Sequence, residues 1–270
     1  MKIKDITNFI EELAPLHYAE DFDNVGLLVG NYNTTVSGVL VTLDTLEQTV
    51  QEAIAKNCNL IVSFHPIIFS GLKKLNGNSY VERVVLKAIK NDIAIYAMHT
   101  ALDNVQQGVS GKICEVLGIQ NPQILIPKSN IKSKETIGMG MIGELPNAMN
   151  EVDLLQFVKT TMKTDCVRHS EILNTPIQKV AVLGGSGSFA ISNAIASKAD
   201  AYISADFKYH DFFKAEKKIL LIDVGHYESE QFTKNLLVEH LTKKITNFAP
   251  ALSVGNIMLS EKSTNPIYYS

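Results

Sequence analysis

The sequence predicts an α/β fold of two similar lobes. Short β-rich runs alternate with segments of helical spacing, and the runs are apolar throughout, which is typical of mostly parallel sheets covered on both faces. The expected strands are GVLVTL, NLIVSF, IAIYAM, KVAVLG, AYISA and KILLIDV. The expected helices cover residues 4–13, 46–56, 80–90, 110–117, 152–162, 189–197 and 229–243.

An internal repeat is the second observation behind the two lobes. Residues 41–65 align without gaps on residues 182–206, so that His65 falls on Asp206. The next strand repeats as well, where IAIYAMHTALD (93–103) matches LLIDVGHYESE (220–230) and each copy ends in a histidine with an acid four residues later. The two copies match in the order of their elements, in spacing and in the polar residues beyond two successive strands. This match predicts a duplicated domain.

A polar, basic stretch with little periodicity, IPKSNIKSKETIGMG, divides the chain almost in half. We therefore expect a first lobe at residues 1–125, a linker at 126–140 and a second lobe at 141–270. The pattern leaves open whether the C-terminal segment packs back on the first lobe.

Composition narrows the class of protein. The 270 residues are 46% hydrophobic, enough for a sizeable core, and 25 basic against 28 acidic residues give no general attraction to nucleic acid or anionic membranes. The three cysteines are far apart without a C-x-x-C pair, so neither disulfides nor a thiolate zinc site is expected. With no apolar run of about 20 residues, we expect a cytoplasmic protein that does not enter the membrane.

Histidines and acids collect where the predicted strands end. At the carboxyl ends of parallel strands such side chains meet, and the mixture of imidazole and carboxylate suits zinc, iron, manganese or nickel. These residues are His65, His99, Asp103, Asp206, His226 and Glu230.

Two of these residues form a pair at helical spacing. His226 and Glu230 lie four residues apart where a helix is expected to start near residue 228, so they share one face. His99 and Asp103 fit less well, because LDNVQQG resembles a loop; Asp103 could reach a metal while His99 supports it. His210, in KYHDF just beyond Asp206, is a candidate for proton transfer.

The glycine-rich turn KVAVLGGSGSFA is a competing signal. Gly185-x-Gly187-x-x-Ala190 follows a strand and opens a helix, as in a short dinucleotide fingerprint. The repeat of this unit in the first half, DTLEQT, has no glycine, and the fingerprint explains none of the histidine and acid pairs. The other interpretation is a tight turn whose N–H groups could hold an anion such as a phosphate.

Together these motifs resemble the GTP cyclohydrolase I type 2 family, also called NIF-three-like. The resemblance covers nearly the whole chain and rests on DFDNVGLLVG, FHPIIFSGLKKL, AMHTALDNV, VAVLGGSGS, ADFKYHDF and DVGHYESE, in the family order. It implies two α/β lobes with a metal site in the cleft between them, homohexameric toroids and one or two divalent ions per chain. The ligands that it implies here are His65, Asp103, His226 and Glu230.

One position departs from the family pattern. Where the family usually has His-His-Pro, this chain has Phe64-His65-Pro66, and phenylalanine has no lone pair for a metal. Either one ion stays tightly bound while the second is weak or absent, or waters and a neighbour such as His99 fill the gap.

The resemblance implies a metal-dependent hydrolase that acts on GTP or another phosphorylated small molecule. In such an enzyme a metal-bound water attacks while His210 or a carboxylate moves protons. The alternative, which the phenylalanine favours, is a metal-binding hexameric scaffold or regulatory protein without catalysis.

Overall fold

The computed structural model describes residues 1–129, 136–248 and 257–270. The chain forms two compact units, Met1–Leu102 with Thr233–Thr264, and Asp103–Phe232 with Asn265–Ser270. The second unit thus begins at Asp103 rather than at residue 141, because α5 (Val109–Leu117) packs on β8 (Ile177–Ser186) and β5 (Gln120–Pro127) pairs with β6 (Gly138–Met149). Within the predicted linker, residues 130–135 lie outside the described part of the chain.

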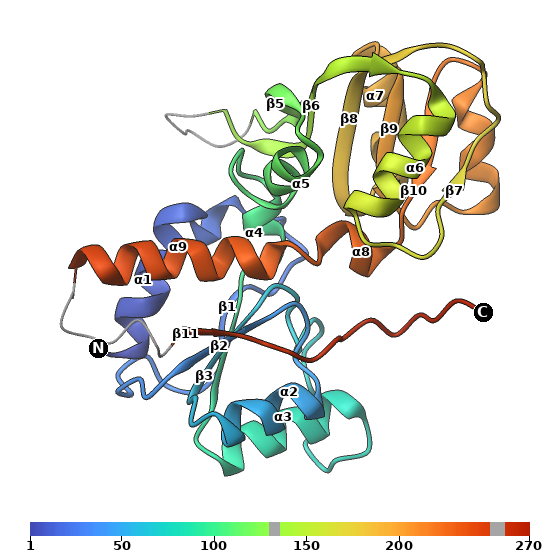
Figure 1. Cartoon of the computed structure of the whole chain (residues 1–270). Helices are drawn as coiled ribbons and strands as arrows, with labels where there is room; N and C mark the ends of the chain where they lie inside the picture. Colours follow the sequence, from blue (N-terminus) through green and yellow to red (C-terminus); the bar gives the residue numbers. More distant parts are fainter. Residues whose placement is uncertain (130–135, 249–256) are drawn as a thin grey trace. The chain divides into compact units, whose positions relative to one another are not determined.

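The first unit is built on a five-stranded sheet in the order β1-β4-β3-β2-β11. Figure 1 labels β1, β2, β3 and β11 of this sheet. Its strands are β1 (Gly26–Val29), β2 (Val39–Thr42), β3 (Leu60–Ser63), β4 (Ala94–Ala97) and β11 (Ile257–Leu259). Among these described strands, β1 alone is antiparallel to its neighbour. Residues far apart in sequence therefore share this unit, since β11 pairs with β2.

Helices cover both faces of this first sheet. On one face α2 (Glu47–Ala55) and α3 (Tyr80–Lys90) pack on a core that includes Leu40, Ile61 and Ile95. On the other lie α1 (Ile3–Leu13) and α9 (Thr233–Phe248), where the Tyr96 hydroxyl donates a hydrogen bond to Glu11. Burial on both faces explains why the strand sequences are apolar throughout.

The second unit is built on a six-stranded sheet in the order β5-β6-β8-β9-β10-β7. Here β8, β9 (Ala201–Ala205) and β10 (Leu220–Asp223) are parallel, whereas β5, β6 and β7 (Arg168–His169) pair antiparallel with their neighbours. The expectation of mostly parallel strands therefore fails for this sheet, which is mixed. The helical elements of this unit are α5, α6 (Glu151–Thr161), η2 (Ser188–Ala190), α7 (Ile191–Ala196), η3 (Tyr209–Ala215) and α8 (His226–Glu230).

The two units confirm the α/β class and repeat one motif. In β2-α2-β3 and in β8-α7-β9, equivalent residues pair in equivalent register, Val39 with Leu60 and Val180 with Ala201. Each motif is followed by a further parallel strand, β4 or β10. The connections from these two strands to the next helix differ in length by one residue. The helix after β4, α4 (His99–Asp103), begins two residues beyond the strand, whereas α8 begins three residues beyond β10, and the added residue is Gly225 with φ +92°.

Most predicted helices occur within one or two residues of the expected bounds. The exception is the helix expected at 229–243, which is two helices, α8 and α9. None of the described helices is long and apolar enough to cross a membrane.

Candidate metal centre

The short helix α8 carries the predicted pair of the second unit. His226 begins this helix and Glu230 ends it, and one turn brings Nε2 of the imidazole to 3.2 Å from Oε2 of the carboxylate. The Glu230 side chain is only 4% exposed. Gly185 makes room for the pair, because a Cβ there would lie 2.3 Å from Glu230 Oε1.

Asp206 fixes the other nitrogen of the His226 ring. Its Oδ2 lies 2.7 Å from His226 Nδ1 and also accepts a hydrogen bond from the Ser186 hydroxyl. The hydrogen bond from His226 lowers the pKa of the Asp206 carboxyl. Because an ionised carboxylate only accepts hydrogen bonds, Nδ1 carries the proton and Nε2 is the nitrogen that can bind a metal.

The charges around His226 suit a cation. Burial disfavours the charged imidazole, but hydrogen bonds and attraction to Asp206 and Glu230 outweigh it and raise the pKa of His226 to about 11. The protonated ring is thus itself a cation held between two carboxylates. A divalent ion bound here would meet the same negative charge.

In the first unit, His65 stands just beyond the end of β3. Its Nδ1 lies 2.8 Å from Asp44 Oδ1, and the Ser63 hydroxyl donates to the His65 carbonyl oxygen at 2.9 Å. As with His226, the carboxylate assigns the proton to Nδ1 and leaves Nε2 as the ligand atom.

His99 has the same arrangement with a different aspartate. Its Nδ1 lies 2.8 Å from Asp23 Oδ1, and Thr100 donates to Asp23 from both its backbone N–H and its hydroxyl. Although burial opposes ionisation, these hydrogen bonds lower the pKa of Asp23. Of the loop expected at residues 102–108, residues 104–108 are loop, but the first two residues end α4, so His99 and Asp103 also sit at helical spacing.

Phe64 is fully buried beside these imidazoles. Its ring centroid lies 4.8 Å from that of His65 and 5.6 Å from that of His99. A hydrocarbon ring, which offers no lone pair to a metal, therefore borders both imidazoles.

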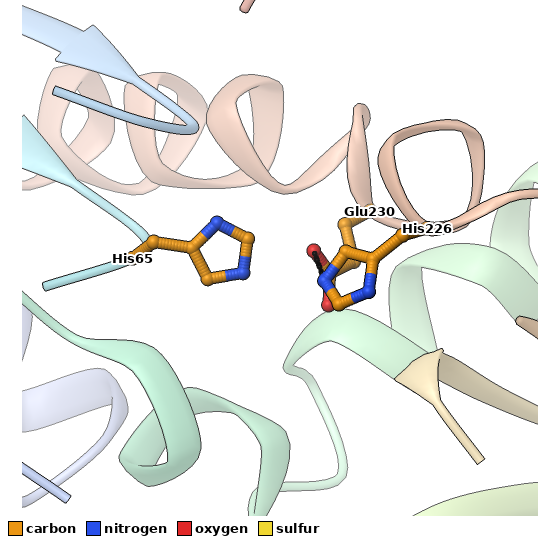
Figure 2. Close-up of side chains that lie close together, drawn as sticks. All are labelled: His65, His226 and Glu230. Carbon is orange, nitrogen blue, oxygen red and sulfur yellow. Dashed lines mark ion pairs between the residues drawn. The ribbon is translucent and has the colours of Figure 1, made fainter. Parts of the chain in front are cut away.

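Three of the four predicted ligands offer donor atoms of the kind that hold a metal ion: His226 and Glu230, side by side on α8 of the second unit (Figure 2), and His65 in the first unit. Two imidazoles and a carboxylate are a donor set that fits zinc and similar divalent ions. Asp103, half-buried at the end of α4, is not a member of this group among the described residues. His210 lies exposed on η3 with its ring against Tyr209 and Phe213.

Sequence reasoning missed two residues that matter here, Asp23 and Asp44. Asp44 follows β2 by two residues, so it was detectable as a carboxylate at a strand end. Asp23 lies in DFDNVGLLVG, a motif to which the sequence alone assigned no contact.

The glycine-rich turn serves packing within the second unit. The Gly185 N–H donates to the Ser229 hydroxyl and the Gly187 N–H donates to the Ala205 carbonyl, so neither is directed at a phosphate. A Cβ at Gly187 would lie 1.9 Å from Ser204 Oγ. Close approach of neighbouring chain explains both glycines, and Asp206 binds His226 and Ser186, which argues against the dinucleotide fingerprint.

Comparison with known proteins identifies the family of this chain. The family model Duf34/NIF3 (NGG1p interacting factor 3) matches residues 1–266. The chain belongs to the Duf34/NIF3 family. A Clostridium acetobutylicum protein named GTP cyclohydrolase 1 type 2 homolog is 32% identical over 98% of both chains.

Solved structures also match along the whole chain. A Bacillus cereus protein related to NIF3 superposes with a TM-score of 0.92 at 25% identity, covering 100% of this chain and 99% of its own. A hypothetical protein of Staphylococcus aureus gives a TM-score of 0.88 at 30% identity over the same shares. The fold and family predicted from the motifs are therefore confirmed.

Proposed function

We propose that this chain binds one or two divalent metal ions through His65, Asp103, His226 and Glu230. The observation that carries the proposal is the His226–Glu230 pair, in which a nearly buried carboxylate lies 3.2 Å from an imidazole nitrogen. Its support is the Asp206 carboxylate, which holds the ring in one tautomer. The donor chemistry suits zinc, iron, manganese or nickel.

We further propose that the protein is a metal-dependent hydrolase of a nucleotide or another phosphorylated small molecule. A bound divalent ion supplies a water whose pKa is lowered towards neutrality. His226 and Glu230 would hold the ion, Asp206 would keep the His226 ring in place, and His210 would move protons. Support for GTP as the substrate comes from relatives named GTP cyclohydrolase 1 type 2 homolog.

A metal-binding scaffold is the second candidate function, and Phe64 favours it. A buried phenylalanine in place of a ligand removes one donor, because its ring has no lone pair for a metal. In this case the chain would assemble as a homohexamer and use metal for structure or regulation. Light scattering on the purified protein tests the assembly for either function.

Elemental analysis tests metal binding directly. Wild-type protein is expected to carry at least about one divalent ion per chain, since three or four side-chain ligands suffice for such a site. His65→Ala and Glu230→Ala should each lose most of it, while His17→Ala, at an exposed histidine, should not. Full metal content in either ligand variant would remove that residue from the site.

Turnover separates the two candidate functions. Protein loaded with zinc, manganese, iron or nickel in turn is incubated with GTP and the products are resolved by chromatography. Hydrolysis that disappears in Glu230→Ala supports the enzyme. Stable metal content with no turnover under any of these ions supports the scaffold.

A further inference from the structure

Each of the three histidines that follow the parallel strands has an aspartate on the same ring nitrogen. Nδ1 faces a carboxylate oxygen at 2.7 to 2.8 Å in every case. The pairs are His65 with Asp44, His99 with Asp23, and His226 with Asp206. By contrast, the rings of His169 and His240 face backbone carbonyl oxygens.

We propose that Asp44 and Asp206 are positioning residues of the metal centre. Each accepts the Nδ1 proton of a ligand histidine, His65 or His226, and so commits Nε2 to the metal. This inference rests on the proposed metal-binding function and adds two residues to it. Metal-bound histidines commonly donate their second ring N–H to a carboxylate, which orients the ring and increases its basicity.

Asp206 is itself held in place by its surroundings. Its backbone is left-handed, with φ +58°, a conformation that Asp tolerates better than most residues, and Ser186 donates to the oxygen that also faces His226. In the sequence repeat Asp206 occupies the position of His65. The same strand end thus supplies a ligand in the first unit and the residue that orients a ligand in the second.

Asp44 is fixed by the C-terminal part of the first unit. The buried Thr264 hydroxyl donates to Asp44 Oδ2 at 2.5 Å, while Oδ1 faces His65. The two carboxylate oxygens therefore have separate partners, the Thr264 hydroxyl for Oδ2 and the His65 ring for Oδ1. Such a clamp restricts rotation of the carboxylate and, through it, of the imidazole.

Paired substitutions separate orientation from charge. Asp206→Ala and Asp44→Ala remove the acceptor, whereas Asp206→Asn and Asp44→Asn keep an oxygen that can accept the Nδ1 proton but remove the charge. Asp165→Asn, at an exposed aspartate of the second unit, is the control. Affinity for Zn²⁺ is measured by competition with a chromophoric chelator, and urea unfolding without metal shows whether each variant folds.

The alanine variants are expected to bind Zn²⁺ about 10- to 100-fold more weakly, and the asparagine variants to lose less. With Co²⁺ in place of Zn²⁺, the shifted, exchangeable Nδ1 proton signal of the affected histidine should persist in the asparagine variant and vanish in the alanine variant. If an alanine variant does not fold, the Zn²⁺ affinity and the Nδ1 proton signal of the asparagine variant test the inference instead.

Two outcomes would overturn the inference, and they differ. Wild-type affinity and an unchanged proton signal in the alanine variants would show that the aspartates do not position the ligands, while metal binding stands. Absence of Zn²⁺ binding by the wild type would remove the proposed function and this inference with it.

Discussion

The Phe64 ring packs against the imidazole of His99, with ring centroids 5.6 Å apart and the planes at 74°. His99 is half-buried, and its own ring centroid lies 5.3 Å from that of His65. Phe64 therefore borders two imidazoles whose Nδ1 atoms are both held by aspartates. Under the proposed function, this hydrocarbon ring offers no donor to a second metal ion.

Phe64→His is expected to raise the metal content by about one ion per chain, because it returns an imidazole donor to a region with two others. Elemental analysis of protein dialysed against Zn²⁺ measures the gain. Phe64→Leu is the matched control: it creates a cavity that costs stability and adds no donor. Equal metal content in wild type and Phe64→His would mean that this position does not limit binding.

Much of the fold could be predicted because its signals are local. Six strands are apolar runs buried on both faces, and a run of that kind predicts a strand from the local sequence alone. These strands are β2, β3, β4, β8, β9 and β10. The antiparallel strands β1, β5, β6 and β7 were missed. In β5, alternate exposed and half-buried residues give little apolar signal, and its partner β6 contains three glycines and a proline.

The geometry of the candidate site was predictable where sequence spacing determines it. His226 and Glu230 were found because one helical turn separates them. Asp23 was not, because its contact with His99 spans 76 residues and depends on how the chain folds. Asp206 was noted as a strand-end acid, but only the structure shows that it accepts the proton of His226.

Metal uptake is expected to depend on pH through His226. Burial opposes its charge, yet the hydrogen bonds to Asp206 and Glu230 raise the pKa of His226 to about 11, so the metal-free ring is protonated at neutral pH. An ion must displace that proton. The apparent affinity for Zn²⁺ should therefore rise about tenfold per pH unit below this pKa.

Competition titrations at several pH values between about 6 and 8 measure this slope. Asp206→Asn removes a carboxylate that raises the pKa of His226, so its affinity should depend less on pH. An affinity that is the same across this range in the wild type would contradict protonation of His226 in the metal-free state.

The Glu52 carboxylate should stabilise the first unit in a pH-dependent way. This buried residue of α2 accepts hydrogen bonds from Ser260 Oγ at 2.6 Å and the Glu261 N–H at 2.9 Å, and it pairs with Lys56 at 2.8 Å. Burial alone would raise the pKa of Glu52, but these partners lower it below the usual 4.5. Glu52→Gln is expected to reduce the free energy of unfolding by about 1 to 3 kcal/mol at neutral pH.

The sign of the pH effect follows from the lowered pKa. The stabilisation is complete above the unfolded-state pKa, near 4.5, and is lost as the pH falls through the folded-state value. Urea unfolding of wild type and Glu52→Gln should therefore show a stability difference at neutral pH that shrinks in acid. A difference that stays constant would show that Glu52 is not ionised in the folded chain.

Gly185→Ala should weaken metal binding by crowding Glu230. Gly185 has φ +70°, and a Cβ there would lie 2.3 Å from Glu230 Oε1 and 3.4 Å from His226 Cε1. Gly118→Ala is the matched control, because Gly118 has φ +67° and a Cβ there meets no described atom within 4 Å. Both substitutions carry the strain of a left-handed alanine, about 1 to 2 kcal/mol, so urea unfolding should show a loss of stability in both.

Zn²⁺ affinity separates the two glycine variants. Only Gly185→Ala should lower it in chelator competition, because only there does the methyl group push the carboxylate from its place beside His226. Equal Zn²⁺ affinity in the two variants would show that Glu230 either moves without cost or does not bind the ion.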